Sequence, residues 1–306
     1  MAMLSVLIPA RHEEFLQHTV DDVFRNARGD VEVLVALDNW DNPPAVSATK
    51  VIQTLRGQRG ATNALAAIAS GDYLMKLDAH CSMAPGFDLA LMEDAGEDVT
   101  IVPAICNLHA YDWVCPAGHR HFQGKYEACE QCGSDKLKKE TVWQMLAKPI
   151  RSSFYFDTAL HFQYCEEEAP GLVHDTMSIQ GSCFMVSQKK YWELELCDEA
   201  FGSWGQQGTE VACKTWLSGG RVLCSKKAFY AHQFRETEGF PYPNPTEKII
   251  EAQKFSRNLF LNNCWPKQVR SFQSLVEQFN FPGDWTPKHL QDLCTPFPTD
   301  FSKSVV

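Results

Sequence analysis

The chain has 306 residues, a formal net charge of −10 at neutral pH and twelve cysteines. A chain of this length can bury a full core, and its acidity argues against broad electrostatic attraction to nucleic acid or anionic membranes. No apolar run reaches the roughly 20 residues that span a bilayer, and the N-terminus lacks the charged start of a signal peptide. We therefore expect a cytoplasmic protein with no membrane partner, whose cysteines are reduced or metal-bound.

The first third of the chain alternates between apolar runs and amphipathic segments. Strands are predicted over residues 4–10, 31–38, 73–78 and 99–106, with helices near 14–27 and 61–70. This alternation is typical of an α/β domain with a mostly parallel sheet between helices. Such sheets bind ligands beyond the carboxyl ends of their strands, where Pro9, Asp38 and Asp78 fall.

The character of the chain changes at residues 113–140, which are polar and rich in cysteine and histidine. The α/β pattern returns afterwards, with a helix near 209–217 and a strand over 221–232. From residue 246 we expect a helical and irregular extension that reaches residue 306. The chain therefore divides into segments 1–112, 113–140, 141–245 and 246–306.

The predicted strand over residues 73–78 ends in Asp78, and His80 follows two positions later. Alternate residues of a strand project to the same side, so both side chains point together where the strand ends. A carboxylate and a neutral imidazole suit a borderline divalent ion such as Mn²⁺. His232, at the end of another predicted strand, is a candidate third ligand. The other interpretation is a chance Asp-x-His pair in a loop, with His80 hydrogen-bonded locally.

Four sequence blocks resemble the nucleotide-sugar glycosyltransferases of the GT-A fold. They are SVLIPARHEE; SGDYLMKLDAHC followed by TIVPAICNL; SIQGSCFMVSQ continuing to WGQQGTEVACKTWLSGG; and AHQFR. They are most similar to the polypeptide N-acetylgalactosaminyltransferase group, in which Asp-x-His binds the metal. The resemblance implies a Rossmann-like sheet. It also implies a nucleotide-sugar-binding half over 1–112 and an acceptor and catalytic half over 141–245.

The resemblance also implies roles for individual residues. It assigns Asp78, His80 and His232 to a Mn²⁺ or Mg²⁺ ion at the diphosphate of a UDP-sugar, where a metal neutralises the leaving group. Arg59 is an alternative to Arg56 at the nucleotide. The residues implied at the nucleotide-sugar are Pro9, Arg11, Glu13, Asp38, Arg56 and Asp78, and those implied in catalysis are Trp204, Gln207, Glu210 and Arg235.

The sequence departs from that group in two respects. Gln207 stands where the group has an acid, and it can hydrogen-bond sugar hydroxyls but cannot ionise; the donor sugar, of GalNAc, GlcNAc or Glc type, therefore stays open. The group's membrane anchor and lectin domain are not found in this sequence, so we do not expect a secretory-pathway role. The group retains anomeric configuration, which we expect here too. We expect Trp216 and His161 to lie in the core.

Residues 115–137 carry a second signal, the pattern of a zinc ribbon. Cys129-x-x-Cys132-Gly is a knuckle that wraps Zn²⁺, and Cys115 and His119 supply the other half of a tetrahedral site. His121 is the alternative to His119, and the other interpretation is a pair of reduced knuckles without metal. Four lysines near the ribbon suggest contact with an anionic polymer, and the other interpretation is a solvated loop or an oligomer contact: Lys125, Lys136, Lys138 and Lys139.

Two classes of function follow. The first is a metal-dependent glycosyltransferase with a macromolecular acceptor, either a hydroxymethylated pyrimidine in DNA, as a bacteriophage would modify, or a protein Ser or Thr. The second is a zinc-ribbon module that binds nucleic acid or protein on a catalytically inactive transferase fold. The intact Asp78, His80 and His232 set favours the first, and Gln207 slightly favours the second. The oligomeric state is left open.

Overall fold

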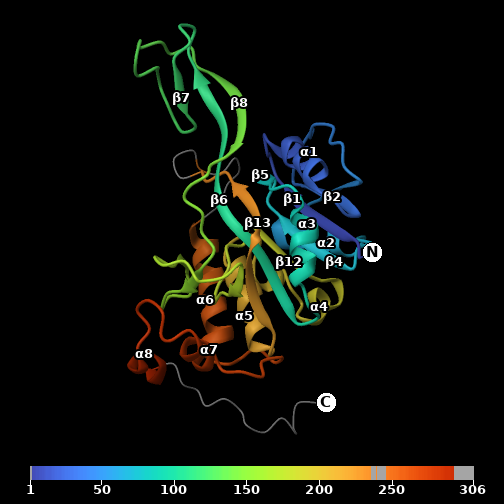
Figure 1. The fold of residues 1–306 in the computed structure, drawn as a ribbon, viewed down its shortest axis with the longest axis vertical. Helices are drawn as coiled ribbons and strands as arrows, with labels where there is room; N and C mark the ends of the chain where they lie inside the picture. Colours follow the sequence, from blue (N-terminus) through green and yellow to red (C-terminus); the bar gives the residue numbers. More distant parts are fainter. Residues whose placement is uncertain (1, 236–238, 240–245, 293–306) are drawn as a thin grey trace.

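The computed structural model describes residues 2–235, 239 and 246–292. Its body is built on one mixed sheet, whose main path runs β11-β13-β6-β12-β4-β1-β2-β3. Helices flank this sheet, and a long hairpin arm projects from one end of the body (Figure 1). The architecture confirms the α/β fold class expected from the sequence.

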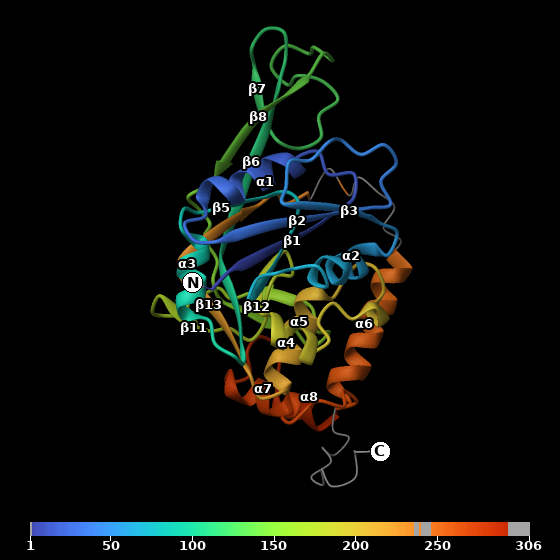
Figure 2. The ribbon, with the colours of Figure 1, turned by 90° about the vertical axis from the view of Figure 1, so that its right-hand side faces the viewer.

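The N-terminal half supplies the parallel part of the sheet. Its strands are β1 (Leu4–Ala10), β2 (Val31–Asp38), β3 (Lys50–Thr54) and β4 (Tyr73–Leu77), and its helices are α1 (Leu16–Asn26) and α2 (Gly57–Ala66). Every residue of β1 is buried, because α1 and α2 lie on opposite faces of the sheet (Figure 2). A strand covered on both faces reads as a continuous apolar run, which is why residues 4–10 were predictable.

The second half adds strands in both directions. Its elements are β5 (Cys81–Met83), α3 (Phe87–Asp94), β6 (Val99–Val114), β11 (Val173–Asp175), β12 (Cys183–Ser187), α4 (Gln188–Glu193), a short 3₁₀ turn η1 (Glu199–Phe201), α5 (Gln207–Leu217) and β13 (Arg221–His232). β12 lies antiparallel between β4 and β6, whereas β13 runs parallel to β6. A separate hairpin joins β9 (Phe154–Phe156) to β10 (Phe162–Tyr164).

The arm is an extension of β6 beyond the sheet, paired with β7 (Arg120–Phe122) and β8 (Lys138–Met145). Its pairing begins at Leu108 opposite Met145, so the hairpin extends beyond residues 113–140 at both ends. A small apolar cluster fixes its base to the start of α1: the ring of Phe15 lies 5.8 Å from Tyr111 and 5.7 Å from Trp143. The Cys/His segment therefore sits on a stem anchored in the body.

The C-terminal helices are α6 (Thr246–Leu261), α7 (Phe272–Gln278) and α8 (Pro287–Asp292). They pack at the end of the body opposite the arm (Figure 1). Of the predicted extension, residues 293–306 lie outside the described part. No helix within the described ranges is both long and apolar enough to cross a membrane.

Trp216 lies in the core, as expected. Its side chain is buried, its indole N–H donates to the Thr176 carbonyl at 3.1 Å, and its ring meets Phe279 edge-on at 5.5 Å. It thereby joins α5 to the C-terminal helices.

We expect Trp216→Ala to lower the free energy of unfolding by about 3–5 kcal/mol, because it leaves a large cavity in the core. Trp192→Ala is the matched control, since that side chain is partly exposed and its loss should cost about 1 kcal/mol or less. Urea unfolding followed by far-UV circular dichroism measures both values. Equal losses in the two variants would contradict the assigned role of Trp216.

Candidate functional site

The three predicted metal ligands converge at the carboxyl end of β4. Asp78 follows β4 directly, His80 precedes β5, and His232 is the last residue of β13. β5 pairs antiparallel with β13 and places Cys81 opposite His232, and the amide of Gln233 donates to the His80 carbonyl at 3.1 Å. Strand pairing thus brings together residues that are more than 150 positions apart.

The spacing of the ligand atoms fits a divalent ion. One ligand atom from each of Asp78, His80 and His232 lies within 4.8 Å of the others. The two Nε2 atoms of the histidines are 3.1 Å apart, and Nε2 of His232 is 3.4 Å from Oδ2 of Asp78. Adjacent ligands of an octahedral ion with bonds slightly over 2 Å lie about 3 Å apart. Two imidazole nitrogens and a carboxylate oxygen match the chemistry of Mn²⁺.

Glu13, predicted at the nucleotide-sugar, lies behind His80. Its Oε2 is 3.2 Å from Nδ1 of His80, and its carboxylate also pairs with the guanidinium of Arg235. Burial raises the pKa of Glu13, but the charges and hydrogen bonds of His80 and Arg235 outweigh it and lower the pKa to about 2. The ionised carboxylate holds the proton of His80 on Nδ1, so that Nε2 presents its lone pair to a metal.

The same site holds a lysine that the sequence analysis missed. The side chain of Lys76 is 1% exposed. Its ammonium pairs with Oδ1 of Asp78 and donates to the Gly181 carbonyl at 2.8 Å. The signal was present in the sequence, because residues 76, 78 and 80 alternate and therefore share one side of the chain. Burial raises the pKa of Asp78, but Lys76 and the two histidines more than offset this and hold it well below its usual range.

Burial dominates the titration of His232. Its pKa falls to about 4, because desolvation disfavours the imidazolium more than the hydrogen bond to Asp78 favours it. The ring is therefore neutral at physiological pH, as a metal ligand must be.

A cavity of about 230 Å³ opens beside Asp78. It is smaller than the roughly 300–1,000 Å³ typical of sites for drug-sized ligands, and so suits one sugar ring better than a whole nucleotide-sugar. Its lining comes from α2, the end of β4, the β9–β10 hairpin, the loops at 179–182 and 204–206, and the first turn of α5. The polar side chains among the lining residues include Gln58, Asp78, His161, Gln180, Ser182, Gln206, Gln207 and Thr209.

Two of the predicted catalytic residues, Trp204 and Gln207, line this cavity. His161 lines it too, with 51% of its side chain exposed, so the expected core position is wrong. The sequence ALHFQY gave no sign of this, because the hairpin that carries His161 is placed by tertiary packing.

Glu210 does not line the cavity; it is fully buried behind the loop that carries Trp204. Its carboxylate accepts from Arg59 at 3.1 Å, from Lys214 at 3.2 Å and from the Asp198 amide at 2.8 Å. The two Nη atoms of Arg59 donate in turn to the carbonyls of Gly202, at 3.1 Å, and Gly205, at 2.6 Å. Arg59 is thus a support for this loop and has no exposed surface for a nucleotide.

The other predicted nucleotide residues lie near the ends of β1 and β2. Pro9 is buried within β1, and Arg11 follows that strand. Asp38 ends β2, and its Oδ1 accepts from the amide of Gly57 at the start of α2, at 3.0 Å. Arg56 is exposed and pairs with Glu199 at 2.5 Å.

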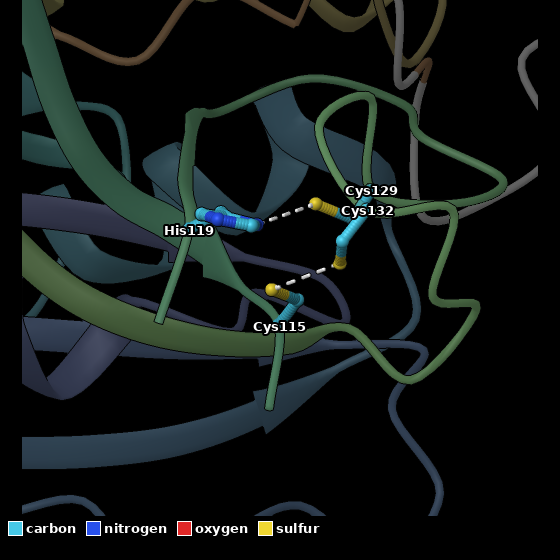
Figure 3. A group of neighbouring side chains, drawn as sticks. All are labelled: Cys115, His119, Cys129 and Cys132. Atoms are coloured by element: carbon cyan, nitrogen blue, oxygen red, sulfur yellow. Dashed lines mark hydrogen bonds between the residues drawn. The ribbon is translucent and has the colours of Figure 1, made fainter. Parts of the chain in front are cut away.

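The second cluster, in the arm, contains Cys115, His119, Cys129 and Cys132 (Figure 3). The sulfurs of Cys115 and Cys132 are 3.7 Å apart, and Sγ of Cys129 is 3.5 Å from Nδ1 of His119. Ligands of a tetrahedral Zn²⁺ with the usual bond lengths lie about 3.8 Å apart for two sulfurs and about 3.6 Å for sulfur and nitrogen.

The geometry favours His119 over His121 as the nitrogen ligand. Nε2 of His121 lies 3.2 Å from Sγ of Cys129. At that distance His121 can donate a hydrogen bond to the sulfur. At Cys115 burial raises the thiol pKa, but the backbone amides of His119 and Ala117 outweigh this and lower it to about 7. A thiol poised in this way readily becomes a thiolate ligand.

Part of the chain is similar to known glycosyltransferases in sequence. Residues 5–126 match the model of glycosyl transferase family 2. The polypeptide N-acetylgalactosaminyltransferase 3 of Taeniopygia guttata is 24% identical over 196 residues, which cover 61% of this chain and 28% of that protein. The chain thus aligns with less than a third of that relative's length.

Two solved structures share the fold. GalNAc-T7, crystallised with UDP, GalNAc and Mn²⁺, matches with a TM-score of 0.59 at 16% identity, over 92% of this chain and 55% of that one. TarS 1–349 of S. aureus, in complex with UDP-GlcNAc, matches with a TM-score of 0.52 at 12% identity, over 92% and 71% of the two chains.

We expect Glu13→Gln to lower the affinity for Mn²⁺ by about 10–100-fold, because an amide fixes the orientation and basicity of His80 less well than a carboxylate does. The control is Glu14→Gln, at an exposed neighbour that pairs with Lys139. Isothermal titration calorimetry with MnCl₂ measures both. Unchanged affinity in Glu13→Gln would remove Glu13 from the metal site.

Proposed function

Because residues 5–126 match the model of glycosyl transferase family 2, we propose that this protein is a metal-dependent glycosyltransferase that moves a sugar from a UDP-sugar to an acceptor hydroxyl. The observation that carries the proposal is the Asp78, His80 and His232 cluster at the carboxyl end of β4, with Asp78 shared by the adjacent cavity. Crevices at this end of parallel strands are where α/β folds bind nucleotides.

In this proposal the metal ligands bind the diphosphate of the donor, and the cavity binds its sugar. Asp78, His80 and His232 would hold a divalent ion, which would supply positive charge to stabilise UDP as the leaving group. Glu13 orients His80, and Arg235, which the structure places on Glu13, lies where it can add a second positive contact to the diphosphate. The uridine then lies toward Pro9, Arg11, Asp38 and Arg56.

The transferred sugar occupies the cavity beside Asp78 in this proposal. Trp204 offers an apolar surface to a sugar ring, while Gln207 and Gln58 offer amide groups to its hydroxyls. Glu210 acts here as a positioning residue, since its carboxylate fixes Arg59 and through it the loop that carries Trp204. A donor of GalNAc, GlcNAc or Glc type fits such neutral polar contacts, and we propose transfer with retained anomeric configuration.

For the acceptor we propose a Ser or Thr hydroxyl on a polypeptide, in line with the polypeptide transferases that this chain resembles. The charge of the arm counts against DNA: residues 113–140 hold five Lys or Arg against four Asp or Glu. Two of those five cations are engaged, Arg120 by Asp112 and Glu140 and Lys139 by Glu14. Residues 113–140, all of which the structure describes, therefore form no strongly basic surface of the kind that DNA binding requires.

We also propose that the arm cluster binds one structural Zn²⁺. The interatomic spacings support it, and so does the small size of the loop between β7 and β8, which has little core of its own. A closed set of four protein ligands leaves no position for a substrate, so the ion stabilises the arm and takes no part in transfer.

We expect UDP release from a panel of UDP-sugars to depend on Mn²⁺, to stop on addition of EDTA, and to fall at least about 100-fold in Asp78→Asn, because metal ligation supplies several kcal/mol of transition-state stabilisation. Asp21→Asn, at an exposed residue of α1, is the control and should leave the rate unchanged. A coupled assay for UDP measures all three proteins, with and without a Ser/Thr peptide library or hydroxymethylcytosine DNA.

The acceptors distinguish the outcomes of that assay. Stimulation by peptides supports the proposed acceptor, and stimulation by DNA alone would overturn it. A folded protein that releases no UDP from any sugar would contradict the enzyme and favour the binding module on an inactive fold.

We expect one equivalent of zinc per chain by atomic emission, reduced to about 0.1 equivalent or less in Cys132→Ser, since losing one thiolate of four removes most of the binding energy. Cys264→Ser is the control, because that exposed thiol lies outside the cluster. The spectrum of Co²⁺-substituted protein tests the ligand set independently. Full zinc content in Cys132→Ser would contradict the assigned site.

A further inference from the structure

The starting point is the placement of Lys76, in the middle of the central sheet. Its register partners are Leu7 on β1 and Phe184 on β12, and its sequence neighbours Met75 and Leu77 are fully buried. A lysine is almost never buried without a partner, because removing an ammonium from water is costly. An apolar side chain could fill the same space without this cost, so packing alone does not explain a lysine at position 76.

Among the described residues, the ammonium contacts one metal-ligand carboxylate and one backbone carbonyl. It contacts Oδ1 of Asp78, while Oδ2 of the same carboxylate faces His232 at 3.4 Å. Its second acceptor, the Gly181 carbonyl at 2.8 Å, belongs to a residue that lines the sugar cavity. Lys76 therefore occupies one oxygen of a ligand carboxylate and leaves the other to a metal.

The charges of the site balance before any ion binds. Asp78 is paired with Lys76, and Glu13 is paired with Arg235. The two imidazoles bring no charge when they act as ligands. A divalent ion bound here keeps a charge near +2 that the protein does not cancel, in a setting where Coulomb interactions are stronger than in water.

We propose that Lys76 couples the metal to the nucleotide: by neutralising Asp78 it makes the site a poor one for Mn²⁺ alone and a good one for Mn²⁺ together with a diphosphate. This inference rests on the proposed function, since it takes the cluster to be the donor site. The diphosphate supplies the negative charge that the protein withholds, and by linkage each ligand must raise the affinity of the other by the same factor. Lys76 is a positioning residue in this scheme, acting through Asp78.

The test is the Mn²⁺ affinity of the full chain with and without saturating UDP, read from the electron paramagnetic resonance signal of free Mn²⁺. In the wild type we expect UDP to raise Mn²⁺ affinity by about tenfold or more, and Mn²⁺ to raise UDP affinity by the same factor. In Lys76→Gln we expect Mn²⁺ alone to bind about tenfold more tightly than in the wild type, because the carboxylate regains its full charge. The coupling factor should shrink correspondingly.

Two controls isolate the charge. Lys76→Arg keeps it and should resemble the wild type, whereas Lys189→Gln removes an exposed lysine that pairs with Glu97 and Glu193, away from the site, and should change nothing. Mn²⁺ binding to Lys76→Gln as weak as in the wild type would overturn the proposal. If that variant does not fold, the wild type alone still tests the proposal. Tight Mn²⁺ binding that UDP does not change would overturn the proposal as well.

Failure of the proposed function gives a different pattern. A wild-type chain that binds Mn²⁺ but neither binds UDP nor releases it from any UDP-sugar would reject the donor site itself. A wild type that binds both ligands and turns over, with Lys76→Gln indistinguishable from it, would reject only the role of Lys76.

Discussion

The pairing of β13 with both β6 and β5 is the constraint on which the site depends. Along most of its length β13 runs parallel to β6, and at its end it pairs antiparallel with β5. The second pairing fixes His232 beside His80, and β5 is joined through residues 78–80 to β4, the strand that delivers Asp78. The three ligand atoms are therefore held by backbone hydrogen bonds of the central sheet, and a site built on strands keeps its geometry better than one built on loops.

Around this centre three buried charges are each paired with an opposite charge. Glu13 meets Arg235, Lys76 meets Asp78, and Arg59 meets Glu210. Unpaired, any one of these charges would cost several kcal/mol of stability or shift its protonation. Because they are paired, the Asp78, His80 and His232 cluster is surrounded by balanced charges, and Arg59 holds one wall of the cavity through the carbonyls of Gly202 and Gly205.

The arm is held by a strand extension and two side-chain clusters. Its stem is a continuation of β6, so its direction is set by the sheet, and Phe15, Tyr111 and Trp143 fix its base against the body. Beyond this cluster the loop has few apolar residues, and the four ligands of the Cys/His cluster take the place of a core (Figure 3). The arm therefore projects from the body as a stem of fixed direction (Figure 1).

The sequence by itself determined the alternation of strands and helices, the Asp78, His80 and His232 set and the Cys/His cluster, because these rest on local patterns: apolar runs, a two-residue alternation and knuckle spacing. Tertiary structure decided the rest. Glu210 and Arg59 are ordinary polar residues of helices in the sequence, and only the packing of α2 against the 202–206 loop makes them a buried pair. His161 reached the cavity through the tertiary packing of the β9–β10 hairpin, which no local pattern encodes. The two-residue spacing of Lys76 and Asp78 already places them on one side of the chain, whereas the contact of Lys76 with the Gly181 carbonyl comes from the 179–182 loop. Burial and long-range pairing decide whether a polar side chain serves the core, another side chain or a ligand, and both arise only when distant segments meet.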